Sequence, residues 1–183
     1  MENTRGSGDD NWMKLRYGNL IEVTLDYSEG ITNAQVLTTI AQSRTAETDA
    51  ANNFPLYNDS AKHFIWNFMM TAYYNQTKAR TIANNHEWGI AMISPIFKYD
   101  AVCIMEQSYA FFKAFFTDDS FMDFWNNCYG RSYPSKGYIS GISAFSYSAF
   151  TAHELVLDGA VTLTDNLTEA HRYSIWSWDW YSY

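Results

Sequence analysis

The chain has 183 residues, a formal net charge of −8 and a pI near 4.8, and 47% of its residues are hydrophobic. This length and composition allow one domain with a substantial buried core. The negative charge argues against a nucleic-acid partner, because phosphate binding relies on clustered Lys and Arg. No apolar run of the roughly 18 residues that a membrane helix needs is present, so we expect a soluble chain without a transmembrane segment.

The N-terminal residues differ from the rest of the chain. Met1–Asp10 has neither the positively charged start nor the apolar stretch of an export signal. We expect residues 1–10 to be a flexible leader and residues 11–183 to form a single globular helical domain. No internal repeat or linker-like stretch divides the longer segment.

The first regular elements are expected to be a strand and a helix. Apolar and polar residues alternate from Ile21 to Tyr27, which predicts a half-buried strand ending near Gly30. The segment Thr32–Gln35 has the spacing of a capping box, with a hydroxyl three residues before an amide. It therefore predicts the start of a helix that runs to about Ala50.

Two helices should follow as an antiparallel hairpin. Apolar residues recur at helical spacing over Ala61–Tyr73, and Asn58 or Asp59 upstream is a suitable N-cap. Thr77 can cap a second helix, in which Gly89 is expected to be the stop signal. The link between the two helices is short, which favours antiparallel packing.

The C-terminal half is predicted to contain further helices. They are a long aromatic helix over Tyr99–Phe116, a new turn at Thr117, a short helix over Phe121–Tyr129 ending near Gly130, and a helix from Phe145 that stops at Gly159. Val161–Thr164 and the tail Tyr173–Tyr183 have strand-like alternation. We therefore expect a mainly α, compact multi-helix domain with a small antiparallel sheet formed by the chain ends.

One polar stripe runs along the first helix of the hairpin. Asp59, His63 and Asn67 stand four residues apart, so an acid, an imidazole and an amide share one side of the helix. His86 and Glu87 come from the second helix, whose end should lie near Asp59 and His63. A working site at this place is the main hypothesis from the sequence.

A third polar cluster follows in the segment Met122–Arg131. Asp123, Asn126, Asn127 and Arg131 are costly to bury together unless they bond one another or a ligand. We predict catalytic roles for Asp59, His63, His86 and Glu87, and substrate binding by Asn67, Asp123, Asn126, Asn127 and Arg131.

These blocks carry a resemblance. Three segments carry it: Asp59-Ser-Ala-Lys-His63-Phe-Ile-Trp-Asn67, then His86-Glu87, then Met122-Asp123-Phe-Trp-Asn126-Asn127-Cys-Tyr-Gly-Arg131. They resemble an uncharacterised bacterial domain family with the pattern D-x-x-R-H-x-x-W-N, H-E and M-D-x-x-N-N-x-x-G-R. The family is found in secreted, wall-associated and toxin-like proteins. The resemblance covers roughly residues 40–160 and implies a helical domain with a shared polar centre, but no established reaction. Lys62 departs from the pattern, which has Arg there and its bidentate recognition of carboxylate or phosphate.

Two kinds of hydrolytic chemistry fit these residues. In the metal-free form, which the sequence favours, His63 or His86 is a general base oriented by Asp59 or Glu87, and amides hold an ester, phosphodiester or glycosidic substrate. In the metal form, His63, His86 and a carboxylate such as Asp123 hold a divalent ion. No zincin motif or nucleophile elbow is present.

A non-enzymatic interaction domain is the competing hypothesis. In it the same polar residues form a buried structural network, and surface aromatics such as Trp176, Trp178 and Trp180 contact a partner protein. His153 is interpreted as a structural residue. For an enzyme, the resemblance implies a small-molecule, lipid or envelope substrate, and it points to a secreted or envelope-associated place in a bacterium.

Overall fold

Helices make up most of the described part of the protein. The computed structural model describes residues 20–93, 109–134 and 151–179, and these ranges contain no strand. The helices are α2 (Leu20–Ser28), α3 (Asn33–Asn53), α4 (Asn58–Tyr73), α5 (Gln76–Ile93), α6 (Tyr109–Phe115), α7 (Asp118–Ser132), a helical segment at 151–157, the 3-10 turn η3 (Thr164–Asn166) and α9 (Glu169–Asp179). Within these ranges, no helix combines the length and apolar character that crossing a bilayer requires.

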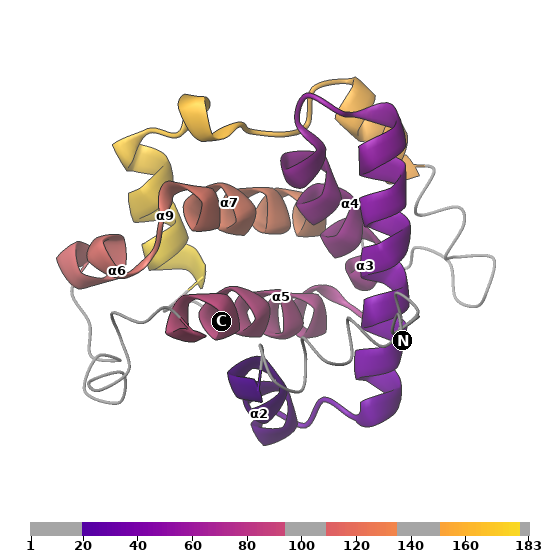
Figure 1. Cartoon of the computed structure of the whole chain (residues 1–183), viewed down its shortest axis with the longest axis vertical. Coiled ribbons are helices and arrows are strands. Elements are labelled where there is room, and N and C mark those ends of the chain that lie inside the picture. Colours follow the sequence, from indigo (N-terminus) through magenta and orange to yellow (C-terminus); the bar gives the residue numbers. More distant parts are fainter. Residues whose placement is uncertain (1–19, 94–108, 135–150, 180–183) are drawn as a thin grey trace, which may run out of the picture.

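Helix α4 is the centre of the packing. It contacts α3, α5 and α7, while α2 packs on α5, and α9 lies against α6 and α7 (Figure 1). Nearly every residue from Ser60 to Thr71 is buried. A helix enclosed on all sides must be apolar or must pair its polar groups, and α4 does both.

Two apolar clusters flank this centre. The first joins α3, α4, α5 and the helix at 151–157, and includes Phe54, Phe64 and Met69. The second joins the end of α5 to α6, α7 and α9 through Trp88, Phe112, Phe116, Phe124 and Ile175. The many aromatic residues of the chain therefore serve mainly as core in the described part of the molecule.

Several predicted helix boundaries are confirmed. Gln35 N–H donates to Thr32 Oγ1 at 3.4 Å and Thr32 N–H donates to Gln35 Oε1 at 2.9 Å, so the capping box is complete at the start of α3. Thr117 Oγ1 accepts from Ser120 N–H at the start of α7. Gly159 follows the helix at 151–157 with φ of +87°, which suits its predicted role as a stop.

The strand predictions are wrong. Residues Ile21–Tyr27 lie in α2, and Tyr173–Asp179 lies in α9, while 180–183 fall outside the described residues. Val161–Thr164 forms no strand and leads into η3. The alternation of apolar and polar residues in Ile21–Tyr27 indicates a strand only if Glu22 and Asp26 are exposed. In α2 they lie four residues apart on one helical face and are buried against polar partners on α5. The expected helix Tyr99–Phe116 is described only from Tyr109, and that from Phe145 only from residue 151.

Two glycines expected to end helices instead allow helices to approach. α5 continues past Gly89 to Ile93, and α7 continues past Gly130 to Ser132. A Cβ atom on Gly89 would lie 2.7 Å from Glu22 Cβ, and one on Gly130 would lie 2.3 Å from the Phe64 carbonyl oxygen. Gly130 therefore sets the close contact between α7 and α4.

Replacement of Gly130 by Ala tests this contact. Helical propensity alone would stabilise the variant by about 1 kcal/mol, but the clash with backbone should reverse the sign and cost about 1–3 kcal/mol. Urea unfolding measures the difference, with Glu47→Ala on the exposed face of α3 as the control. An unchanged or higher free energy of unfolding for Gly130→Ala would contradict the close packing.

The contact of α2 with α5 predicts a pH effect. Burial raises the pKa of Asp26 to about 7, against the hydrogen bond from Asn85 and with a further contribution from Glu22. Between pH 3.8 and about 7 the folded state thus binds more protons at Asp26 than the unfolded chain does, so the free energy of unfolding falls as pH rises through this window.

Asp26→Asn should remove this contribution, since the amide keeps an acceptor for Asn85. At pH 8 we expect the variant to melt about 2–4 °C above the parent protein, the shift that 1 kcal/mol gives in a domain of this size. At pH 5 the two should melt together. Parallel melting curves at both pH values would show that Asp26 does not titrate between them.

Candidate functional site

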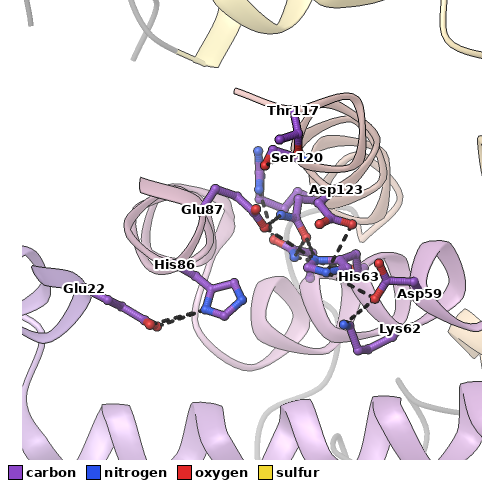
Figure 2. Close-up of polar contacts among 12 residues, drawn as sticks. Glu22, Asp59, Lys62, His63, His86, Glu87, Thr117, Ser120 and Asp123 are labelled. Atoms are coloured by element: carbon purple, nitrogen blue, oxygen red, sulfur yellow. Dashed lines mark hydrogen bonds and ion pairs between the residues drawn. The ribbon is translucent and has the colours of Figure 1, made fainter. Parts of the chain in front are cut away.

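Side chains from α4, α5 and α7 meet between the helices (Figure 2). Those of α4 and α7 have the same spacing: Asp59, His63 and Asn67 face Asp123, Asn127 and Arg131. Contacts run in the same order along both helices, so α4 and α7 are parallel here. Two stripes with a four-residue period thus face each other, and Glu87 of α5 joins them from the side.

A chain of hydrogen bonds crosses this interface. Arg131 Nη1 donates to Asn67 Oδ1 at 3.0 Å, Asn67 Nδ2 donates to Asn127 Oδ1, and Asn127 Nδ2 donates to Glu87 Oε1 at 3.2 Å. We call these four residues the amide chain. A guanidinium has no acceptor, so Arg131 at one end fixes the orientation of both amides.

The amide chain determines the tautomer of His63. Asn127 presents its oxygen to His63 Nδ1 at 3.1 Å, so Nδ1 carries a proton and donates it. In the neutral ring Nε2 then holds a lone pair. Nε2 lies 3.2 Å from Asp123 Oδ1 and 3.9 Å from Asp59 Oδ1. We call Asp59, His63 and Asp123 the His63 centre.

Burial and neighbouring charges shift the pKa values of His63 and Asp123 in opposite directions. Burial, with the positive charges of Lys62 and His86, holds the pKa of His63 well below its usual range. Burial, with the negative charges of Glu87 and Asp59, raises the pKa of Asp123. Burial also raises the pKa of Glu87. At neutral pH the arrangement therefore favours a neutral imidazole beside a protonated Asp123.

One atom of the His63 centre lacks a hydrogen-bond partner among the described residues. Oδ1 of Asp123 is fully buried and has no hydrogen-bond partner there, although it lies 3.2 Å from Nε2. Buried polar atoms normally have a partner in protein or water. This oxygen points toward Nε2 of His63 (Figure 2), so the two atoms need either the carboxyl proton of Asp123 or a cation between them at 3.2 Å.

The centre reaches the surface at Asp59. His63 is 2% exposed, but the Asp59 side chain is 51% exposed and pairs with Lys62. Asp59 lines a surface hollow of about 370 Å³ together with Asp119 and Met122 of α7 and Leu163–Asp165 around η3.

The structure does not place His86 within the centre. Its Nδ1 lies 3.3 Å from both carboxylate oxygens of Glu22, and its ring centroid is 6.3 Å from that of His63. Burial opposes the charge on His86, but the pairing with Glu22 outweighs it and raises its pKa to about 9. His86 is therefore a cation that ties α5 to α2 (Figure 2).

The three buried asparagines of α4 and α7 do not all belong to the amide chain. Asn67 and Asn127 are 0% exposed, which places them behind His63 and away from the hollow. Asn126 points elsewhere, because neighbours on a helix are about 100° apart. Its side chain donates to Thr162 O at 2.9 Å and accepts from Thr162 N–H at 2.8 Å, which fixes the segment before η3.

Some residues around the centre and the hollow were not predicted from the sequence. Glu22 as partner of His86, and Asp119 and Asp165 at the hollow, lie in no motif. The four-residue spacing of Glu22 and Asp26 was the available signal for a polar helical face. The residues around the hollow are far apart in the chain, so no local pattern could join them.

Three side chains could hold a metal ion. Donor atoms of Asp59, His63 and Asp123 all lie within 4.8 Å of one another. His86, which the sequence offered as a ligand with His63, is paired with Glu22 instead. The metal candidates His63 and Asp123 are thus together, with Asp59 as the third donor.

Comparison of the chain with protein-family models, with curated proteins and with solved structures finds no match. The reasoning about function therefore rests on the geometry of the site.

Replacement of Asn127 by Leu tests the amide chain. Leu cannot accept from His63 and Asn67 or donate to Glu87, so three buried groups lose a partner. We expect the free energy of unfolding to fall by about 3 kcal/mol or more. Urea denaturation measures it, with exposed Asn166→Leu as the control. Equal stability of the two variants would mean that the chain contributes little to the fold.

Proposed function

We propose that the protein is a hydrolase of a toxin-like, envelope-directed type that activates water at the His63 centre. The observation that carries this proposal is the Nε2 lone pair of His63, which is fixed by the amide chain and faces two carboxyl groups beside a surface hollow. Hydrogen bonds behind the ring hold it in one tautomer, as a catalytic imidazole requires.

The centre has the groups that hydrolysis needs. Water adds its oxygen to the carbon or phosphorus of an ester, phosphodiester or glycosidic bond, and one of its protons passes to a base. The bond to the leaving oxygen breaks as that oxygen receives a proton. Nε2 of His63 suits the first role, and Asp123 suits the second because its raised pKa keeps its proton near neutral pH.

The buried Oδ1 of Asp123, which has no hydrogen-bond partner in the described residues, supports a functional site over a purely structural network. A network that only fixes packing is expected to satisfy its buried atoms, because each unpaired one costs stability. Here the amide chain is paired from end to end, whereas Oδ1 of Asp123, next to the exposed Asp59, is one of several buried side-chain atoms without a hydrogen-bond partner in the described residues. Perturbed carboxyl groups beside a hollow are typical of functional sites.

A binding or interaction domain is the second candidate. The burial of Asn67, Asn127, Glu87 and Arg131 favours it, since these residues hold three helices together and do not reach solvent. Asp59 separates the two functions. It is half exposed and outside the amide chain, so an interaction domain has little need of it.

Asp59→Asn is therefore the decisive variant. Asp59 lies 3.9 Å from Nε2 at the edge of the hollow, where it can hold the attacking water, so we expect hydrolysis to fall by about 100-fold or more in this variant. The melting temperature should be unchanged, because an exposed acid contributes little to stability. Asp49→Asn is the matched control: Asp49 also pairs with a histidine, His153, at 2.9 Å, but away from the centre.

The readouts are growth of bacteria that export the protein to the periplasm, and release of product from phospholipid vesicles, purified cell wall and simple esters. Growth inhibition and product release should persist in Asp49→Asn and be lost in Asp59→Asn. If both variants act like the parent protein, or if the parent is inert on every substrate and harmless to growth, the interaction domain is the better description.

A further inference from the structure

The tautomer of His63 determines what the centre can bind. Arg131 orients Asn67, Asn67 orients Asn127, and Asn127 takes the Nδ1 proton of His63. The lone pair on Nε2 is thereby directed at Asp123 Oδ1, 3.2 Å away, and this oxygen has no donor within the described residues. Two acceptors repel at this distance unless the carboxyl proton of Asp123 or a bound cation lies between them.

Distances within the centre suit a metal ion. In a tetrahedral site with bonds of about 2.0–2.2 Å, ligand atoms lie about 3.3–3.6 Å apart. Nε2 of His63 is 3.2 Å from Asp123 Oδ1 and 3.9 Å from Asp59 Oδ1. The longer separation involves the half-exposed Asp59, whose side chain can shorten it by a small rotation.

The surroundings of His63 resemble those of a histidine ligand. Such ligands bind the ion through one ring nitrogen and donate the other N–H to an oxygen that fixes the ring. His63 Nδ1 does this to Asn127 Oδ1, and Asn127 is in turn held by Asn67 and Glu87. The support behind the ring is therefore present before an ion binds.

From this geometry we infer that Asp59, His63 and Asp123 form a binding site for a divalent transition-metal ion, Zn²⁺ or Mn²⁺. An imidazole nitrogen disfavours Mg²⁺ and Ca²⁺, which prefer oxygen ligands, and the set contains no thiolate that would select softer ions. Three carboxyl groups, those of Asp59, Asp123 and Glu87, gather around one imidazole, and an ion bound there takes over the contact that Asp59 makes with Lys62.

This inference deepens the proposed function and rests on it for its chemical role. Three protein donors leave coordination positions open, and Asp59 borders the hollow where a water and a substrate can enter. An ion in this place would lower the pKa of bound water and polarise the bond to be cleaved. His63 and Asp123 are then ligands, and the ion replaces them in activating water.

Calorimetric titration of the metal-free, full-length protein with Zn²⁺, and separately with Mn²⁺, tests the site. We expect about one ion per chain, with affinity at least tenfold weaker in Asp59→Asn and in Asp123→Asn. Asp49→Asn, which alters the His153 pair outside the centre, should bind as the parent protein does. Because Asp123 is buried, Asp59→Asn keeps the test valid if the other variant fails to fold.

Two results would overturn the inference. One is the absence of binding at micromolar metal, and the other is equal affinity in the parent protein, Asp59→Asn and a folded Asp123→Asn, which would place the ion elsewhere. Co²⁺ provides a second readout, since its visible absorption reports nitrogen and oxygen ligands directly and should disappear in Asp59→Asn.

The metal site and the hydrolase can fail separately. If no ion binds while hydrolysis persists after dialysis against EDTA, the metal inference is wrong and general acid-base catalysis at His63 remains. If Zn²⁺ binds at the three residues but no substrate is cleaved and growth is unaffected, the ion site stands and the hydrolase is wrong. Hydrolysis that EDTA abolishes and Zn²⁺ restores supports both.

Discussion

The hydrogen bond from Arg131 to Asn67 is the interaction on which the polar interior depends. A guanidinium can only donate, so it orients Asn67, then Asn127, and finally the ring of His63. If the direction were reversed, Nε2 would carry the proton and donate it to Asp123. Arg131, at the far end of the amide chain, therefore decides which ring nitrogen of His63 is protonated.

The amide chain requires α4 and α7 to pack closely against each other. Gly130 has no side chain and faces the Phe64 carbonyl, which lets the two polar stripes approach within hydrogen-bonding distance. The aromatic clusters on both sides hold the helices in that position and exclude water. Burial in turn strengthens the amide chain and makes an unpaired oxygen at Asp123 costly.

Structural and functional readings of such a centre need not exclude each other. The buried residues Asn67, Asn127, Glu87 and Arg131 join three helices and orient His63, while Asp59 connects the same network to solvent. His86 and Glu22 form a separate pair that attaches α2. A rigid interior that ends at one exposed acid is a suitable support for a reactive or ion-binding group.

The sequence by itself determined the helical class, the capping box at Thr32, the hairpin of α4 and α5, and the four-residue stripe of Asp59, His63 and Asn67, because these depend on local periodicity. It marked Asp123, Asn126, Asn127 and Arg131 as one polar cluster without showing which of them share a face. It misplaced α2 and α9 as strands and took Gly89 and Gly130 as stops, because buried polar faces and helix approaches depend on partners distant in the chain. Only the tertiary structure decided that Asn127 faces His63 while Asn126 does not, that His86 pairs with Glu22, and that Asp59 and Asp123 meet at Nε2. Those choices follow from which helices pack together, a long-range property that spacing along one helix cannot specify.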